Sequence, residues 1–101
     1  MTTHIVVSTF RPGTDMRDVF AVVDQERAQV AALVADGRLG SVHLSPERGT
    51  VFLEVVAADA DAARATVETL PMAVWWDIDV FPVAAPAGNP TQAGWNPGGA
   101  A

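Results

Sequence analysis

The chain has 101 residues, of which 50% are hydrophobic, a formal net charge of −6 and no cysteine. This length predicts a single domain with one core, which leaves little room to enclose a ligand without a second copy of the chain. All six basic residues are arginines, and they are spread along the chain rather than clustered. We therefore expect neither nucleic acid nor an anionic membrane surface as a partner.

The absence of cysteine excludes disulfides, thiolate metal sites and thiol nucleophiles. His4 and His43 are the only imidazoles, and their surroundings do not supply the carboxylates of a metal site. No apolar run approaches the length of a membrane span, and the first residues lack the pattern of a secretory signal. We expect a cytoplasmic protein with no metal and no cofactor.

The first third of the sequence predicts a strand followed by a long helix. Residues 4–10 are rich in branched and aromatic side chains and are followed by the turn-forming sequence RPGT. From 15 to 36 the apolar spacing changes to three and four, which predicts one helix of about twenty residues. Thr14 or Asp15 can cap its start, and Gly37 can end it in the left-handed conformation.

The middle of the sequence predicts a hairpin and a second helix. Residues 38–45 and 50–57 alternate apolar and polar side chains on either side of a turn that contains proline and glycine. A short alanine-rich helix follows, with Asp59 or Asp61 as its cap and Pro71 after its end.

The last apolar run, 74–83, predicts a fourth strand, so the order of elements is β-α-β-β-α-β. This order is typical of the α+β ferredoxin-like fold, a four-stranded antiparallel sheet with both helices on one face. The other face stays uncovered, so we expect two sheets to associate face to face. The domain is expected to cover 1–84, and the Pro/Gly-rich segment 85–101 is expected to be a flexible tail in which Trp95 either anchors on another surface or is solvated.

Glu26 is the most informative polar residue because it lies within an apolar stripe of the long helix. At 100° per residue the members of that stripe are Val19, Val23, Val30 and Leu33. Arg27 holds the same place in the neighbouring stripe. Burying a charge is unfavourable unless it is paired or neutralised, so this pair is a candidate general base with an orienting cation. Alternatively, the helix rolls so that Glu26 reaches water at the core edge and Arg27 extends along the surface.

Other polar residues are weaker candidates. His4, at the start of the first strand, is either a proton carrier or hydrogen-bonded structure, and His43 is expected to be structural. Asp77 and Asp79 share one face of the last strand, about 7 Å apart. They could act as a paired acid and base, or as charges that protect an edge strand from aggregation.

The segment 70–80, LPMAVWWDIDV, followed by FPV, resembles the closing strand of the muconolactone isomerases, which typically reads LPLFPYMDIEV. Three further features resemble the same family: His4 near the start, Pro12 with Asp15 and Met16, and the pair Glu26 and Arg27 placed eleven residues before Gly37. The resemblance covers about 1–84.

The resemblance implies a dimeric α/β barrel, often assembled into rings, whose pocket is closed by a neighbouring chain. It also implies a reaction of aromatic catabolism in which a proton moves across an unsaturated lactone without a cofactor. Glu26 would then be the base, with His4 as a helper, and Arg27 would hold the substrate carboxylate and the dienolate charge. The basic, aromatic stretch that follows the helix-ending glycine in that family is absent, so a homologue acting on a less charged substrate is an equal alternative.

Two other functions stay open. One is a cofactor-free monooxygenase or ring-modifying protein of the wider dimeric α/β-barrel group, whose pocket for a polycyclic aromatic would use Trp75, Trp76 and Phe52. The other is a non-catalytic module that binds a small ligand. All three predict a small-molecule ligand and self-association as a dimer or larger ring.

Overall fold

A computed structural model of the chain describes residues 1–84, and the segment 85–101, which contains Trp95, lies outside the described residues. The strands are β1 (Thr2–Phe10), β2 (Leu39–Ser45), β3 (Thr50–Ala57) and β4 (Trp76–Pro82). The helices are α1 (Met16–Ala21), α2 (Val23–Ala35) and α3 (Ala60–Glu68), with 3₁₀ helices η1 (Pro46–Arg48) and η2 (Pro71–Trp75).

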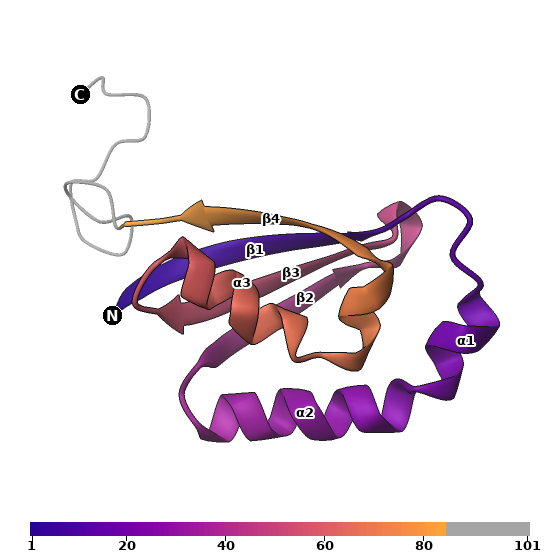
Figure 1. The fold of residues 1–101 in the computed structure, drawn as a ribbon, viewed down its shortest axis with the longest axis horizontal. Coiled ribbons are helices and arrows are strands. Elements are labelled where there is room, and N and C mark those ends of the chain that lie inside the picture. The colour runs from indigo at the N-terminus through magenta and orange to yellow at the C-terminus, as the bar shows by residue number, and fades with distance from the viewer. Residues whose placement is uncertain (85–101) are drawn as a thin grey trace, which may run out of the picture.

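The four strands form one sheet in the order β2-β3-β1-β4, and every neighbouring pair is antiparallel (Figure 1). β1 and β3 are the central strands, and β2 and β4 form the edges. The predicted α+β class and four-stranded antiparallel sheet are therefore confirmed, and the arrangement is compatible with a ferredoxin-like fold.

The predicted single helix over 15–36 is wrong in one respect, because two helices meet at Val22. The backbone of Val22 has φ −109° and ψ 9°, outside the helical region, and α2 begins there without a side-chain cap. No glycine or proline marks the break, and the apolar spacing continues through it. Both predicted ends are confirmed: Asp15 accepts a hydrogen bond from Arg17 N at 2.9 Å, and Gly37 has φ +75°.

The predicted start of the last strand at residue 74 is also wrong. Pro71 opens the 3₁₀ helix η2, which runs through Trp75, and β4 begins only at Trp76. Proline fits the first turn of a helix because its missing N–H has no partner to lose there. The run of branched and aromatic side chains resembles a strand, but its first part forms a turn that carries the chain from α3 back to the sheet.

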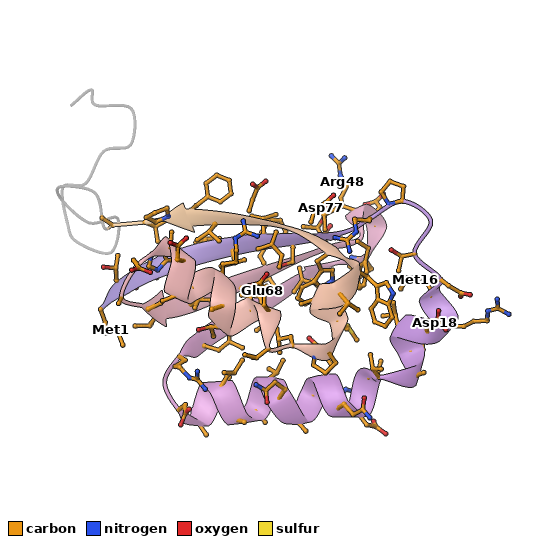
Figure 2. All side chains as sticks on the ribbon, viewed as in Figure 1. Met1, Met16, Asp18, Arg48, Glu68 and Asp77 are labelled. Carbon is orange, nitrogen blue, oxygen red and sulfur yellow. The ribbon has the colours of Figure 1, made fainter. Side chains whose placement is uncertain are left out.

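The core lies between the helices and one face of the sheet. Its buried residues from the sheet include Val6, Leu53, Val55 and Trp76, and those from the helices include Leu33, Ala63 and Val67. On the opposite face, called the outer face below, Phe52 and Phe81 are 38% and 51% exposed. Figure 2 shows Asp77 projecting from β4 on the side away from α2. The helices thus cover one face of the sheet, as predicted, and leave the other open.

Candidate functional site

A hollow on the described part of the chain opens between α1, α2 and the turn that joins β2 to β3. Its volume is about 710 Å³. The large apolar residues that line it are Phe10, Met16, Phe20, Met72 and Trp76, and its polar lining residues are Glu26, Arg27, Ser45 and Thr50. A hollow of this size and composition can hold a small ring compound.

The break at Val22 helps to form this hollow. α1 contributes Val19 and Phe20, and α2 contributes Glu26 and Val30. Figure 1 shows α1 as a separate short helix at one end of α2. Phe20 is 68% exposed, so the rim of the hollow is apolar and in contact with solvent.

Glu26 is the carboxyl group of the hollow. Its side chain is half-buried, and Oε1 accepts a hydrogen bond from the backbone N–H of Met72 at 2.9 Å. One turn later on α2, Gln29 Nε2 donates to Thr69 Oγ1 at 3.0 Å. These two contacts hold one side of α2 against the end of α3 and the first turn of η2, and they fix where the Glu26 side chain points.

The surroundings of Glu26 change its acidity. Burial raises the pKa of Glu26 above its usual value, and the hydrogen bond from Met72 N lowers it by a smaller amount. A carboxyl with a raised pKa is a weaker acid and, once ionised, a stronger base, and a pKa shifted toward the working pH suits a group that both accepts and returns a proton. The hollow therefore holds one group suited to accept and return a proton.

Arg27 lines the same hollow but is itself exposed. No ion pair joins it to Glu26: the pairs found within residues 1–84 are Arg11–Asp77, Arg17–Asp15 and Arg38–Asp36. Its guanidinium is consequently free to meet an anionic group of a ligand at the mouth of the hollow.

The indole N–H of Trp76 is buried in the described chain without a hydrogen-bond partner, and so is the hydroxyl of Ser8. The Trp76 ring packs edge-on against Phe10, with 6.0 Å between ring centroids. This aromatic pair forms part of the wall of the hollow.

The structure brings together three of the six residues predicted for the site, namely Glu26, Arg27 and Trp76. His4 does not line the hollow. It is buried in β1, where Nδ1 donates to the carbonyl of Thr2 at 3.0 Å, and it lies about 20 Å along the strand from Phe10. The position of His4 therefore does not support a direct role beside Glu26 within one copy of the chain.

Phe52 and Trp75 also lie outside the hollow lining. Phe52 is on the outer face because its neighbours along β3, Val51 and Leu53, face the core. Trp75 ends η2 and is half-buried. The predicted grouping of both residues with Trp76 in one pocket is not the arrangement observed within a single copy.

The remaining candidates lie on the outer face. Asp77 and Asp79 are exposed on the edge strand β4, and Arg11 Nη1 lies 3.7 Å from Asp77 Oδ1. His43 is exposed on β2, opposite Phe52. Neither the two aspartates nor His43 lines the hollow around Glu26.

The residue of the site that the sequence does not predict is Met72, whose backbone N–H donates to Glu26. It lies 46 residues from Glu26 and contributes a backbone group, which no side-chain pattern reveals. The one signal in the sequence is Pro71, which ends the preceding helix and indicates a turn near Met72.

Within residues 1–84 there is no group of three or more His, Cys, Asp or Glu residues arranged to hold a metal ion. No helix in that part of the chain is long and apolar enough to cross a membrane. Comparison of the sequence with models of known protein families and with curated proteins finds no match.

Proposed function

We propose that this protein is a cofactor-free isomerase that moves a proton within a small unsaturated lactone, with Glu26 as the base. The observation that carries the proposal is the half-buried Glu26 carboxyl in a hollow of about 710 Å³ whose lining is mostly apolar. The likeness of the closing segment 70–80 to the muconolactone isomerases supports the same reaction.

The reaction needs one group that takes and returns a proton. The Glu26 carboxylate accepts a proton from the saturated carbon at the far end of the conjugated C=C–C=O system, and the C–H electron pair moves into that system to give a dienolate. The Glu26 carboxylic acid then returns the proton to the carbon next to the carbonyl, two carbons away, so the double bond moves and no atom is gained or lost. Met72 N–H orients the carboxyl group through its hydrogen bond. Arg27 stabilises the substrate carboxylate and the negative charge of the dienolate.

The test is turnover of muconolactone followed by its absorbance change, with the full chain and two variants. Glu26→Gln should reduce the rate by about 10²–10⁴-fold, the usual contribution of a general base. Glu68→Gln is the matched control because Glu68 is exposed on α3 and lies outside the hollow (Figure 2). A folded Glu26→Gln chain that keeps the activity of the unmodified chain would remove Glu26 as the base.

A second function is favoured by the aromatic wall of the hollow. Phe10, Phe20 and Trp76 line it, and they suit a flat aromatic compound as well as a lactone. A cofactor-free monooxygenase would consume oxygen in the presence of such a compound and would not isomerise the lactone. Binding without either reaction would identify a non-catalytic ligand-binding module.

We also propose that the protein associates with copies of itself through the outer face. Phe52 and Phe81 leave an apolar surface in contact with water there, and burying it is favourable. Sedimentation of the full chain should give a dimer or a larger ring, and a monomer at high concentration would refute the proposal.

A further inference from the structure

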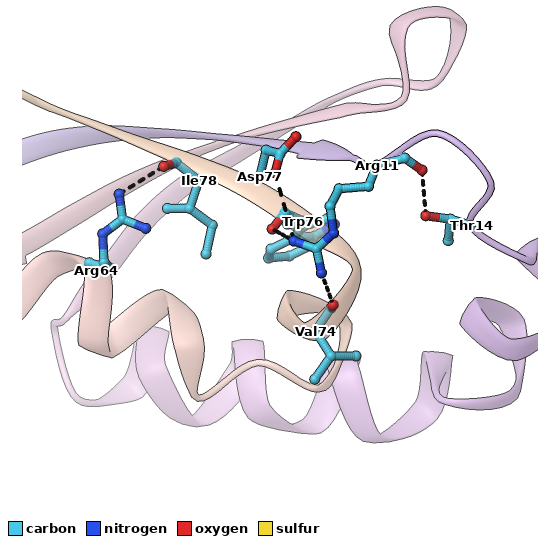
Figure 3. A network of polar contacts seen from close by, with 7 residues as sticks. All are labelled: Arg11, Thr14, Arg64, Val74, Trp76, Asp77 and Ile78. Carbon is cyan, nitrogen blue, oxygen red and sulfur yellow. Dashed lines mark hydrogen bonds and ion pairs between the residues drawn. The ribbon is translucent and has the colours of Figure 1, made fainter.

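Arg11 binds three consecutive carbonyl groups at the point where η2 ends and β4 begins. Its backbone N–H donates to the carbonyl of Trp75 at 2.9 Å. Its guanidinium donates to the carbonyl of Trp76 from Nη1 at 2.6 Å, and to that of Val74 from Nη2 (Figure 3). The last carbonyls of a helix have no partner within the helix, and arginine side chains are among the groups that supply one. One residue of the connection between β1 and α1 therefore closes the end of η2.

The guanidinium is held by these carbonyls more than by its charged neighbour. Arg11 Nη1 lies 3.7 Å from Asp77 Oδ1, and the two side chains are 49% and 73% exposed, so this ion pair contributes little to stability. The two carbonyl bonds go to separate nitrogens of one rigid fork, which a lysine side chain with its single nitrogen cannot reproduce. The geometry of these bonds thus depends on arginine at this position.

The carbonyl of Arg11 is fixed as well. Thr14 donates to it twice, from its backbone N–H at 3.2 Å and from Oγ1 at 2.6 Å. These bonds close the turn that leads from β1 into α1, the helix that contributes Met16 and Phe20 to the hollow. Arg11 therefore links η2 to the segment that carries the chain into α1, and both helices contribute residues to the lining of the hollow.

η2 carries the backbone group that orients Glu26. The N–H of Met72, in the first turn of η2, donates to Glu26 Oε1 at 2.9 Å. At the other end of η2, the N–H of Trp76 donates to the carbonyl of Ala73, the residue next to Met72. A shift of the carbonyls that Arg11 holds would be transmitted through this short turn to Met72. The position of the Met72 N–H thus depends on how the end of η2 is held.

We propose that Arg11 is a positioning residue of the hollow, which holds η2 so that the Met72 N–H stays within hydrogen-bond distance of Glu26. Arg11 does not line the hollow, so it acts through η2 and not on a ligand. Trp76, whose carbonyl Arg11 binds, also packs its ring against Phe10 in the wall, so the same bonds hold the aromatic side of the hollow. The kinetic consequence of this role rests on the proposed isomerase function, whereas the placement of Met72 does not.

The hydrogen bond at Met72 can be followed by NMR of the full chain made with ¹⁵N-labelled methionine. The first of the three methionines carries a terminal amine, so the backbone amide signals are those of Met16 and Met72, and Met16→Leu identifies them. An amide proton bonded to a carboxylate moves downfield when the carboxylate ionises. The Met72 signal should therefore move between about pH 4 and about pH 8, where Arg27, the other charged residue of the lining, keeps its charge. Glu26→Gln should abolish this movement.

Arg11→Ala removes both guanidinium bonds and should abolish most of the pH-dependent movement of the Met72 signal. A change of charge alone would shift the midpoint of the movement and leave its size unchanged, so the size reports the hydrogen bond. Arg11→Lys keeps the charge but loses the fork, and it should also reduce the movement. Arg64→Ala is the matched control, because Arg64 Nη2 donates to the carbonyl of Ile78 at 2.8 Å, farther along β4 from η2 (Figure 3). It should leave the movement as it is in the unmodified chain.

Turnover of muconolactone by the same chains provides a second measurement. Arg11→Ala should lower kcat about tenfold or more, and by a larger factor than it changes KM, because the base is misplaced. A folded Arg11→Ala chain whose Met72 signal moves as far as in the unmodified chain would overturn the inference. An equal loss of movement in Arg64→Ala, or an unchanged kcat in Arg11→Ala, would also overturn it. An unmodified chain without turnover would refute the proposed reaction, while the Met72 signal would still decide the role of Arg11.

Discussion

Replacing Glu26 by glutamine should make the protein more stable at neutral pH, by an amount that depends on pH. Burial raises the pKa of Glu26 in the folded chain above the value of 4.5 that applies to an unperturbed glutamate. Between 4.5 and the folded pKa, the folded state binds more protons than the unfolded state, so the free energy of unfolding falls as pH rises. Below this window Glu26 is protonated in both states and causes no loss. Above this window the ionised Glu26 lowers the free energy of unfolding by its full amount, and this decrease is absent from Glu26→Gln.

Glu26→Ala supplies the matched comparison that isolates the hydrogen bond. Glutamine keeps an oxygen that can accept from Met72 N, where Glu26 Oε1 now accepts at 2.9 Å, and alanine does not. A neutral hydrogen bond contributes about 0.5–1.5 kcal/mol, so Glu26→Ala should be about 1 kcal/mol less stable than Glu26→Gln. Neither variant carries a charge at this position, so their difference should not change with pH.

The assay is urea unfolding followed by circular dichroism from about pH 4 to about pH 8, at one protein concentration because the proposed association would contribute to stability. The free energy of unfolding of Glu26→Gln minus that of the unmodified chain should increase as pH rises and should then become constant. A difference that is flat across the range, or that shrinks with rising pH, would refute the reasoning. It would mean that the folded chain does not favour the protonated carboxyl.

Three further predictions concern the core, a helix cap and the ligand. Leu33→Ala should lower the unfolding free energy by about 2–5 kcal/mol in urea titrations, because Leu33 is fully buried. The neighbouring residue Val34 is 49% exposed, so Val34→Ala should change the unfolding free energy by less than about 0.5 kcal/mol. Asp59→Ala should cost about 1 kcal/mol in the same assay, since Asp59 Oδ1 accepts from Ala62 N at 2.8 Å at the start of α3, and an unchanged stability would contradict this role. Arg27→Gln should raise the KM for an anionic lactone more than for a neutral one, and equal effects on both would show that Arg27 does not meet the carboxylate.

Local signals predicted most of the fold. Asp15 and Asp59 cap helices where the spacing placed them, and Gly37 and Gly49 have positive φ at the ends of predicted elements. These features depend on a few neighbouring residues, so the sequence contains them directly. The break at Val22 could not be predicted, because a valine in a regular apolar pattern gives no local reason for a helix to stop.

The site could be predicted only in part for a similar reason. Glu26 was identified because a carboxylate in an apolar stripe conflicts with its surroundings, and this conflict is visible in the spacing alone. The hollow around it forms where α1, α2 and the hairpin turn meet, and its lining residues, such as Met16 and Val42, have the pattern of ordinary core residues. His4 was placed correctly on the strand, but the distance of that strand end from the hollow follows from the packing of the whole sheet.

The most direct test of Glu26 as the proton-transferring group is hydrogen exchange on a substrate. Muconolactone is incubated with the full chain in deuterated water and followed by proton NMR, which detects removal of the C–H proton even when isomerisation is incomplete. We expect deuterium to enter the positions flanking the double bond and Glu26→Gln to slow this exchange by about 10²-fold or more. Exchange at the same rate in a folded Glu26→Gln chain would contradict the claim that Glu26 moves the proton.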